Sequence, residues 1–145
     1  MVNSIIILLS TFLYVGYLPF IPGTFGSLAG IFLYYLIKEN LSLYLISGLG
    51  ILALGFLVAG RAEKILNRKD SPRIVIDEVS GILIALAFIP YDIKLVIIGF
   101  FLFRILDTLK PYPAGPLQGL KGSAGIMSDD IVAGLYTNII LQLIK

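Results

Sequence analysis

Residues 61–73, RAEKILNRKDSPR, form the longest polar stretch that precedes the C-terminal loop of an otherwise strongly apolar chain. Five basic residues stand there against the two acids Glu63 and Asp70. Because Lys and Arg collect on the cytoplasmic side of membrane segments, we expect this stretch to lie in the cytoplasm. The orientation of every other apolar segment then follows by alternation.

The composition indicates a chain surrounded by lipid. Of its 145 residues, 58% are hydrophobic and only 14% are charged, and the mean hydropathy is +0.98. A soluble domain of this size needs more charged surface, so we expect most of the outer surface to face hydrocarbon. The length suits a single membrane-embedded domain over residues 1–145. The net charge is +2 with no dense basic tract, which argues against nucleic acid as a partner.

The apolar segments predict an all-α fold, and they lie at residues 4–20, 25–37, 41–60, 74–89, 93–108 and 131–144. Only the third reaches the roughly 20 residues that a helix needs to cross about 30 Å of hydrocarbon. We therefore expect a compact polytopic helical membrane bundle with short and partly embedded helices. The first segment lacks the marks of a removed signal peptide, and either a plain span or a half-embedded helix fits it.

Alternation from the cytoplasmic stretch brings four polar clusters to one membrane face. They are PGTFGS at 22–27, Asp77-Glu78, the triplet Arg104, Asp107 and Lys110, and Asp129-Asp130, which we expect to begin the last helix. We also expect the loop 109–130 to be cytoplasmic. The clusters are far apart in sequence, so their meeting at one face predicts a site.

The residue types at this face restrict its chemistry. The chain has no cysteine and no histidine, which excludes thiolate nucleophiles, histidine bases and zinc sites built on sulfur or imidazole. Carboxylate oxygens are the ligands that Mg²⁺ prefers, and Arg and Lys suit phosphate oxygens. Together they predict a Mg²⁺-dependent membrane enzyme that acts on a phosphorylated lipid.

Each cluster also has a plainer interpretation. Asp77 and Glu78 fit a helix start, where acids are favoured by the helix dipole. The charged triplet, spaced by three residues, fits an intrahelical salt bridge. Ser128 or Asp129 fits a cap for the last helix, and PGTFGS fits an ordinary capped helix start. A cap needs only one such side chain, so paired acids favour a site.

The four motifs together resemble the phosphatidylglycerophosphatase A family of bacterial membranes. The matching stretches occur in the family's order and are FIPGTFGSLAG (20–30), DSPRIVIDEVSG (70–81), FRILDTLKPYP (103–113) and GSAGIMSDDIVAG (122–134). With the helices between them, they cover nearly the whole chain. Ser123 stands where the family pattern leads us to expect a second glycine, and we expect this departure to leave activity intact.

The resemblance implies Mg²⁺-dependent hydrolysis of the terminal phosphomonoester of phosphatidylglycerophosphate, which yields phosphatidylglycerol and phosphate. It also implies a multi-pass protein of the bacterial inner membrane whose active site faces the cytoplasm. The metal-binding acids implied are Asp77, Glu78, Asp107, Asp129 and Asp130. For catalysis we expect Asp77, Asp107 and Asp130, and for phosphate binding Thr24, Ser27, Arg104 and Lys110. Attack by water and attack through a phospho-aspartate both stay open.

A small membrane metal or ion transporter that uses the same acids is the alternative. Acids inside membrane segments often mark ion paths. Transport favours acids near the middle of the membrane, however, and the segment 41–60 carries no charge. A non-catalytic membrane subunit is a third interpretation, but it does not account for the repeated acid pairs.

Overall fold

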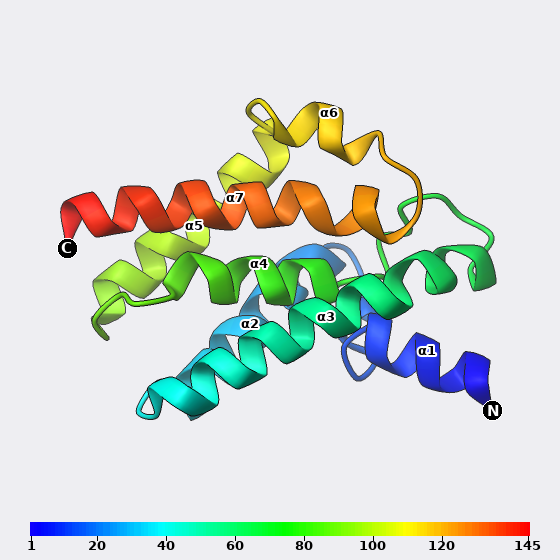
Figure 1. Ribbon diagram of the computed structural model, residues 1–145, viewed down its shortest axis with the longest axis horizontal. Coiled ribbons are helices and arrows are strands. Elements are labelled where there is room, and N and C mark those ends of the chain that lie inside the picture. The colour runs from blue at the N-terminus through cyan, green and yellow to red at the C-terminus, as the bar shows by residue number, and fades with distance from the viewer.

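The computed structural model describes residues 1–145 and is entirely helical, as the segment pattern predicts (Figure 1). Seven α-helices and one 3₁₀-helix follow in the order α1 Val2–Ser10, η1 Val15–Tyr17, α2 Pro22–Ile37, α3 Leu41–Ile65, α4 Ile76–Leu86, α5 Ile93–Leu109, α6 Ala114–Gln118 and α7 Ser123–Ile144. There are no strands, so the predicted all-α class is confirmed.

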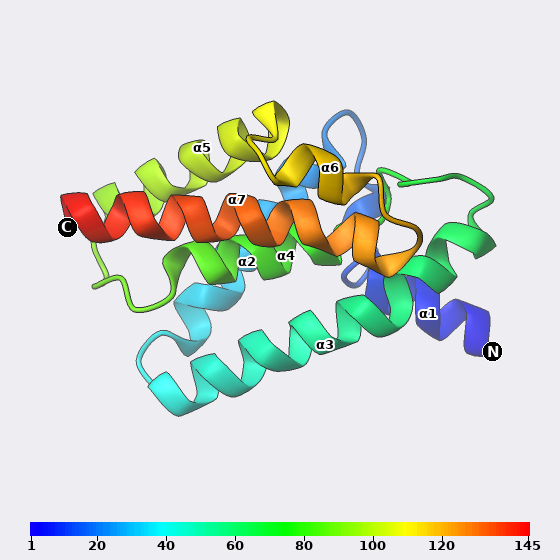
Figure 2. The same cartoon turned by 45° about the horizontal axis from the view of Figure 1, so that its top comes forward.

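The short helix α4 lies at the centre of the bundle. Nine of its eleven residues are buried, which is typical of a helix that is apolar on most sides and packed on most sides. It packs most extensively against α7 and next against α2, and α3 and α5 also contact it. Figure 2 shows α4 running beside α7 in a second view. Asp77 at the start of α4 therefore lies inside the protein, and Glu78 beside it is partly buried.

Close backbone approach between α4 and α7 depends on two glycines. A Cβ atom at Gly134 would stand 2.5 Å from the carbonyl oxygen of Gly81, which belongs to backbone that cannot move aside easily. A Cβ atom at Gly81 would stand 3.0 Å from the Asp130 carbonyl oxygen of α7, and it would also meet the buried Phe103 ring of α5 at 2.6 Å. The two helices approach this closely because neither carries a side chain at the contact.

Gly26 and Gly30, two small residues spaced by four, lie at a helix contact. A Cβ atom at Gly26 would meet Val75 at 2.8 Å, and one at Gly30 would collide with Ile82. The pair therefore seats α2 against α4, as the spacing of four residues suggests for helices in lipid. This contact brings the start of α2 next to the start of α4.

The first apolar segment, 4–20, is not one helix. Helix α1 ends at Ser10, and Phe12, Leu13 and Tyr14 all have positive φ angles that no continuous helix allows. Nine residues reach only about 14 Å, or half of the hydrocarbon thickness. The structure therefore rules out a plain span over 4–20, and the half-embedded alternative is the one that its length fits.

Only α3 is long and apolar enough to cross a membrane by itself. Its 25 residues reach about 37 Å, and Gly48 and Gly50 face open space. It extends to Ile65, so the polar stretch 61–73 begins inside the helix. The membrane arrangement of the remaining, shorter helices stays a prediction.

The C-terminal loop differs from the prediction in two ways. Residues 109–130 are not a plain loop, because they contain the short helix α6. Helix α7 begins at Ser123 and not at Asp129, so the predicted cap by Ser128 or Asp129 is wrong. Gly122 precedes it with φ 64°, and the Ser123 hydroxyl accepts a hydrogen bond from the Gly60 backbone N–H at 2.7 Å. A contact from a distant helix therefore fixes the start of α7.

Candidate active site

The acids of α4 occupy its first turn. Helix α4 begins at Ile76, so Asp77 and Glu78 follow directly at the positive end of the helix dipole. The plainer interpretation of this pair as a helix start is therefore correct as to place. The helix start does not provide hydrogen-bond partners for all of their oxygens, because Asp77 Oδ1 and Glu78 Oε2 are buried without a partner. A helix dipole alone leaves that burial uncompensated.

The charged triplet lies at the end of α5 and is paired internally. Arg104 Nη1 donates to Asp107 Oδ2 at 3.0 Å, and Lys110 Nζ donates to Asp107 Oδ1 at 3.4 Å. The predicted salt bridge on one helix face is confirmed for Arg104 and Asp107. Lys110 itself ends the helix in the left-handed conformation, with φ 48° and ψ 60°. Asp107 therefore accepts from two cationic side chains at once.

Lys110 also connects the end of α5 to α7. Its ammonium group donates to Asp129 as well as to Asp107, and the side chain is 24% exposed. Partial burial by itself lowers the pKa of Lys110, but the hydrogen bond to Asp129 and the charges of the nearby acids outweigh it. The pKa of Lys110 is raised above its usual value. The lysine therefore stays charged beside the acids.

Three carboxylates meet between α5 and α7. Ligand oxygens of Asp107, Asp129 and Asp130 all lie within 4.8 Å of one another, a spacing that suits a shared metal ion. Asp129 and Asp130 are 4% and 2% exposed. They occupy the second turn of α7, where its axis passes the start of α4 (Figure 1). Asp130 is also a neighbour of Asp77, so it connects the two groups of acids.

The unpaired oxygens of these acids fit a hard divalent cation. Four buried carboxylate oxygens, on Asp77, Glu78, Asp129 and Asp130, have no hydrogen-bond partner. Uncompensated buried carboxylate oxygens are costly unless a cation neutralises them. All the donors are oxygen atoms, with no nitrogen or sulfur ligand available, and this donor set suits Mg²⁺. The residues present therefore fit the predicted ion.

The start of α2 closes the site from another side. A Cβ atom at Gly23 would stand 2.5 Å from Glu78 Oε1 and 3.2 Å from Arg104 Nη2, so these side chains press against the first turn of α2. Thr24 lies in the same turn and is partly exposed. Ser27 is fully buried, and its hydroxyl donates to the Gly23 carbonyl at 3.2 Å. The Ser27 hydroxyl therefore bonds within its own helix, and the expected contact of Ser27 with phosphate stays a prediction.

The structure thus brings together the acids and bases that the sequence singled out from three separate stretches, and the PGTFGS stretch lies beside them. The clusters at the starts of α2 and α4, the end of α5 and the second turn of α7 all meet there. Gly23 is the residue that sequence reasoning missed. It belongs to the PGTFGS stretch, whose hydroxyl groups were the predicted functional groups. Its role is to carry no side chain, because Glu78 and Arg104 occupy the space that a side chain would fill.

Comparisons with known proteins match most of the chain. The sequence profile described as "Phosphatidylglycerophosphatase A" matches residues 8–145. A phosphatidylglycerophosphatase A of Escherichia coli K12 is 40% identical over 135 residues, covering 89% of this chain and 77% of its own. The enzyme of the same name from Haemophilus influenzae is 34% identical over 128 residues, covering 86% and 78%.

A Bacteroides thetaiotaomicron protein named "Putative phosphatidylinositol-3-phosphatase" is 34% identical over 139 residues, which is 90% of this chain and 87% of its own. No solved structure matches the chain. The profile spans all four polar clusters, from the start of α2 to the last helix. The chain therefore belongs to the phosphatidylglycerophosphatase A family of phosphatases.

Proposed function

We propose that this phosphatase hydrolyses the terminal phosphomonoester of phosphatidylglycerophosphate with the help of Mg²⁺. The observation that carries the proposal is the set of buried, unpaired carboxylate oxygens beside Arg104 and Lys110. The acids supply a cation site, and the two bases supply partners for a phosphate group. The names of the E. coli and H. influenzae relatives point to the same substrate.

Asp107, Asp129 and Asp130 would hold the cation, with Asp77 and Glu78 at the adjoining side of the cluster. Mg²⁺ supplies positive charge that neutralises the phosphate and the acids around it. Excess negative charge at the site supports this assignment, because five carboxylates face only two basic side chains. A dianionic phosphate would otherwise be repelled from such a cluster.

Arg104 and Lys110 would hold the phosphate oxygens. The guanidinium of Arg104 donates one bond to Asp107, which leaves further N–H groups of its planar fork for phosphate. Lys110 is a point charge held between Asp107 and Asp129, and it would move part of its bonding to the phosphate. Thr24 lies in the first turn of α2, where free backbone N–H groups also favour an anion.

In the reaction an oxygen–phosphorus bond forms to the nucleophile, and the bond between phosphorus and the glycerol oxygen breaks. The glycerol oxygen takes up a proton, and water supplies the oxygen of the released phosphate. Asp77, Asp107 and Asp130 are the proposed catalytic carboxylates, since each can accept a proton from the attacking water or attack phosphorus itself. A carboxyl group that has taken up a proton, or a water molecule, can then supply the proton to the glycerol oxygen. A trapping experiment distinguishes the two nucleophiles. A phosphorylated aspartate would indicate attack by a carboxylate, and its absence would indicate direct attack by water.

Membrane embedding with the site at the cytoplasmic face completes the proposal. Helix α3 is long enough to span, and the basic stretch 61–73 begins within the last residues of this helix. The lipid substrate would reach the site from the inner leaflet without leaving the membrane. The transporter alternative gains no support, because the relatives that match are all named as phosphatases.

The test is phosphate release by the purified protein in detergent. Phosphatidylglycerophosphate with Mg²⁺ should release phosphate, EDTA should stop the release, and added Mg²⁺ should restore it. A phosphatidylinositol 3-phosphate arm is included because the Bacteroides relative carries that name. Folded protein that is inert on phosphatidylglycerophosphate would overturn the proposed substrate, and activity that survives EDTA would overturn the cation requirement.

A further inference from the structure

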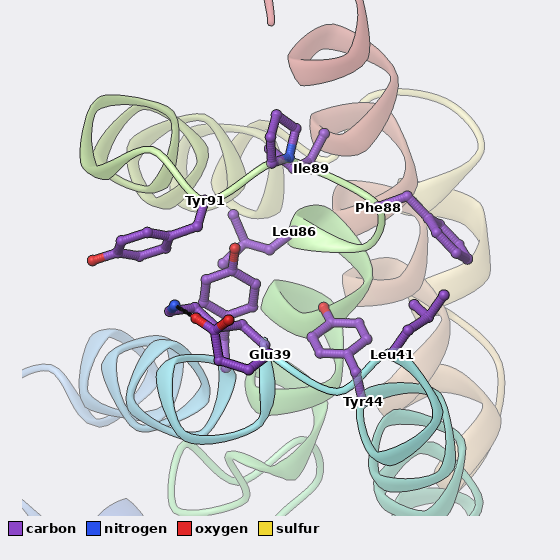
Figure 3. Close-up of a pocket in the computed structure, with 10 residues that line it drawn as sticks. Glu39, Leu41, Tyr44, Leu86, Phe88, Ile89 and Tyr91 are labelled. Atoms are coloured by element: carbon purple, nitrogen blue, oxygen red, sulfur yellow. Dashed lines mark hydrogen bonds and ion pairs between the residues drawn. The ribbon is translucent and has the colours of Figure 1, made fainter.

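A second polar pocket lies at the opposite end of the bundle from the acids. It has a volume of about 290 Å³ and is formed where α2 and α4 end and α3 and α5 begin. Its walls carry Tyr34, Tyr44 and Tyr91 together with the charged pair Lys38 and Glu39. Figure 3 labels Tyr44, Tyr91 and Glu39 among the residues around the pocket. Ile93, at the start of α5 beside this pocket, lies about 20 Å along the helix from Asp107. The proposed reaction uses none of these residues.

The positive charge in this pocket is held among aromatic rings. Lys38 Nζ lies 4.1 Å from the centre of the Tyr91 ring and 5.4 Å from that of Tyr35, and the side chain is only 13% exposed. Its ammonium group also pairs with Glu39, whose side chain is 83% exposed. Aromatic faces stabilise a cation in this geometry. The pocket thus holds one cation that it shields and one anion that it leaves open to solvent.

The tyrosines are themselves fixed in place. Tyr34 and Tyr44 pack edge to face with ring centres 5.9 Å apart, and the Tyr44 hydroxyl donates to the Leu83 carbonyl of α4. The ring centres of Tyr34 and Tyr91 lie 6.4 Å apart. Both Tyr34 and Tyr44 are nearly fully buried. The walls are therefore preorganised, which lowers the entropic cost of binding a ligand.

The charges of the pocket select a zwitterion. A purely anionic group would meet the Glu39 carboxylate, and a purely cationic group would meet the Lys38 ammonium. The helix dipoles favour neither sign, because two helices end here and two begin here. A group with both charges places its phosphate on Lys38 and its ammonium on Glu39 and a tyrosine face, so each charge has a partner. Phosphoethanolamine is the simplest lipid headgroup with both charges.

The surroundings of the pocket favour a lipid as the source of that headgroup. The apolar side chains of Leu41, Phe88 and Ile93 around it are 55%, 64% and 58% exposed. Tyrosines gather at the boundary between hydrocarbon and water, where an acyl chain can lie along apolar surface while its headgroup reaches the pocket. We propose that the pocket formed by Tyr34, Lys38, Glu39, Tyr44 and Tyr91 binds the headgroup of an aminophospholipid in the leaflet opposite the active site.

This inference rests on the proposed membrane embedding but not on the proposed substrate. The test is calorimetric titration of the purified full chain in detergent with dihexanoyl phosphatidylethanolamine. Saturable binding is expected, and dihexanoyl phosphatidylglycerol should bind at least about tenfold more weakly, since the ammonium group is worth a charge-assisted bond. Free phosphoethanolamine, which lacks acyl chains, should bind more weakly still.

Variants identify the site. Lys38→Gln and Glu39→Gln should each weaken binding of the amino lipid about tenfold. Lys94→Gln is the matched control, because Lys94 is an exposed lysine at the start of the neighbouring helix α5 and does not line the pocket. The affinity of this variant for the amino lipid should stay within about twofold of the wild-type value. Phosphatase activity should be unchanged in all three variants, which shows that they are folded.

Three results would overturn the inference. Equal affinity for the phosphatidylglycerol and phosphatidylethanolamine lipids would remove the claim of a zwitterion site. Equal affinity for free phosphoethanolamine would remove the lipid as its source. Absence of saturable binding in active protein would mean that the tyrosines only form an interfacial belt. Loss of phosphatidylglycerophosphate hydrolysis with lipid binding intact would count against the proposed function alone.

Discussion

Replacement of Asp130 by asparagine should stabilise the cation-free protein. Its carboxylate is 2% exposed, one of its oxygens is unpaired, and its ligand atom lies within 4.8 Å of those of Asp107 and Asp129. Two unit charges 4.8 Å apart repel by about 3.5 kcal/mol at an effective dielectric constant of 20. Because asparagine has nearly the same shape as aspartate, Asp130→Asn removes repulsion without leaving a cavity.

The net gain is smaller than the pair repulsion because Arg104 and Lys110 already neutralise part of the cluster. We expect about 1–2 kcal/mol, which corresponds to roughly 3–8 °C in the unfolding midpoint of a domain of this size. The same variant should lose the stabilisation by Mg²⁺. A cation at 100 times its dissociation constant stabilises the wild-type protein by about 2.7 kcal/mol.

The assay is thermal unfolding in detergent at pH 8, with EDTA and with a Mg²⁺ series, for wild type, Asp130→Asn and Asp92→Asn. Asp92 caps α5 by accepting from the Lys94 backbone N–H at 2.7 Å, and asparagine caps equally well. This control changes the charge by the same amount outside the site. An Asp130→Asn variant that is less stable in EDTA and keeps the full Mg²⁺ shift would refute the reasoning.

Three further substitutions test the phosphate partners and the packing around the site. Arg104→Lys should raise KM for the lipid about tenfold with a smaller change in kcat, because a point charge replaces the planar fork, and steady-state phosphate release measures it. Gly134→Ala should lower the unfolding free energy by about 1–3 kcal/mol, since its Cβ would stand 2.5 Å from the Gly81 carbonyl oxygen. Asn138→Ala should lower it by about 1–3 kcal/mol as well, because the Asn138 amide donates to the Ile84, Ala85 and Ala87 carbonyls at the end of α4. Denaturant titration checks both.

Each of these has a clear contrary outcome. Unchanged KM in Arg104→Lys would show that the guanidinium only pairs with Asp107. A Gly134→Ala protein as stable as wild type would mean that α4 and α7 can separate without cost. If Asn138→Ala unfolds like wild type, the end of α4 is satisfied by other donors.

The sequence was sufficient to predict that distant acids and bases meet, and the structure brings them together. The prediction assumed that the stretch 61–73 is cytoplasmic and that the apolar segments alternate across a membrane, which would carry Asp77, Asp107 and Asp130 to one face. That membrane arrangement itself stays a prediction. The Gly26–Gly30 pair similarly predicts a close helix contact, since spacing of four residues places both on one face. These inferences depend on regular helices, which the pattern of apolar residues along the sequence predicts well.

What the sequence could not predict depends on contacts between distant residues. The start of α7 is fixed by Gly122 with positive φ and by the bond from Gly60 to Ser123, and neither is visible in local pattern. The break after α1 lies in a stretch that reads as continuously apolar. The pocket around Lys38 joins residues from α2, α3 and α4 and from the two connections between α2 and α3 and between α4 and α5, so only the folded chain assembles it.

The most direct measurement of the central claim is a structure of the protein with Mn²⁺ in place of Mg²⁺ and a phosphonate analogue of the lipid bound. Anomalous scattering should place the ion about 2.1–2.2 Å from oxygens of Asp107, Asp129 and Asp130, with phosphonate oxygens on Arg104 and Lys110. An ion bound elsewhere, or a phosphonate group away from both bases, would contradict the account.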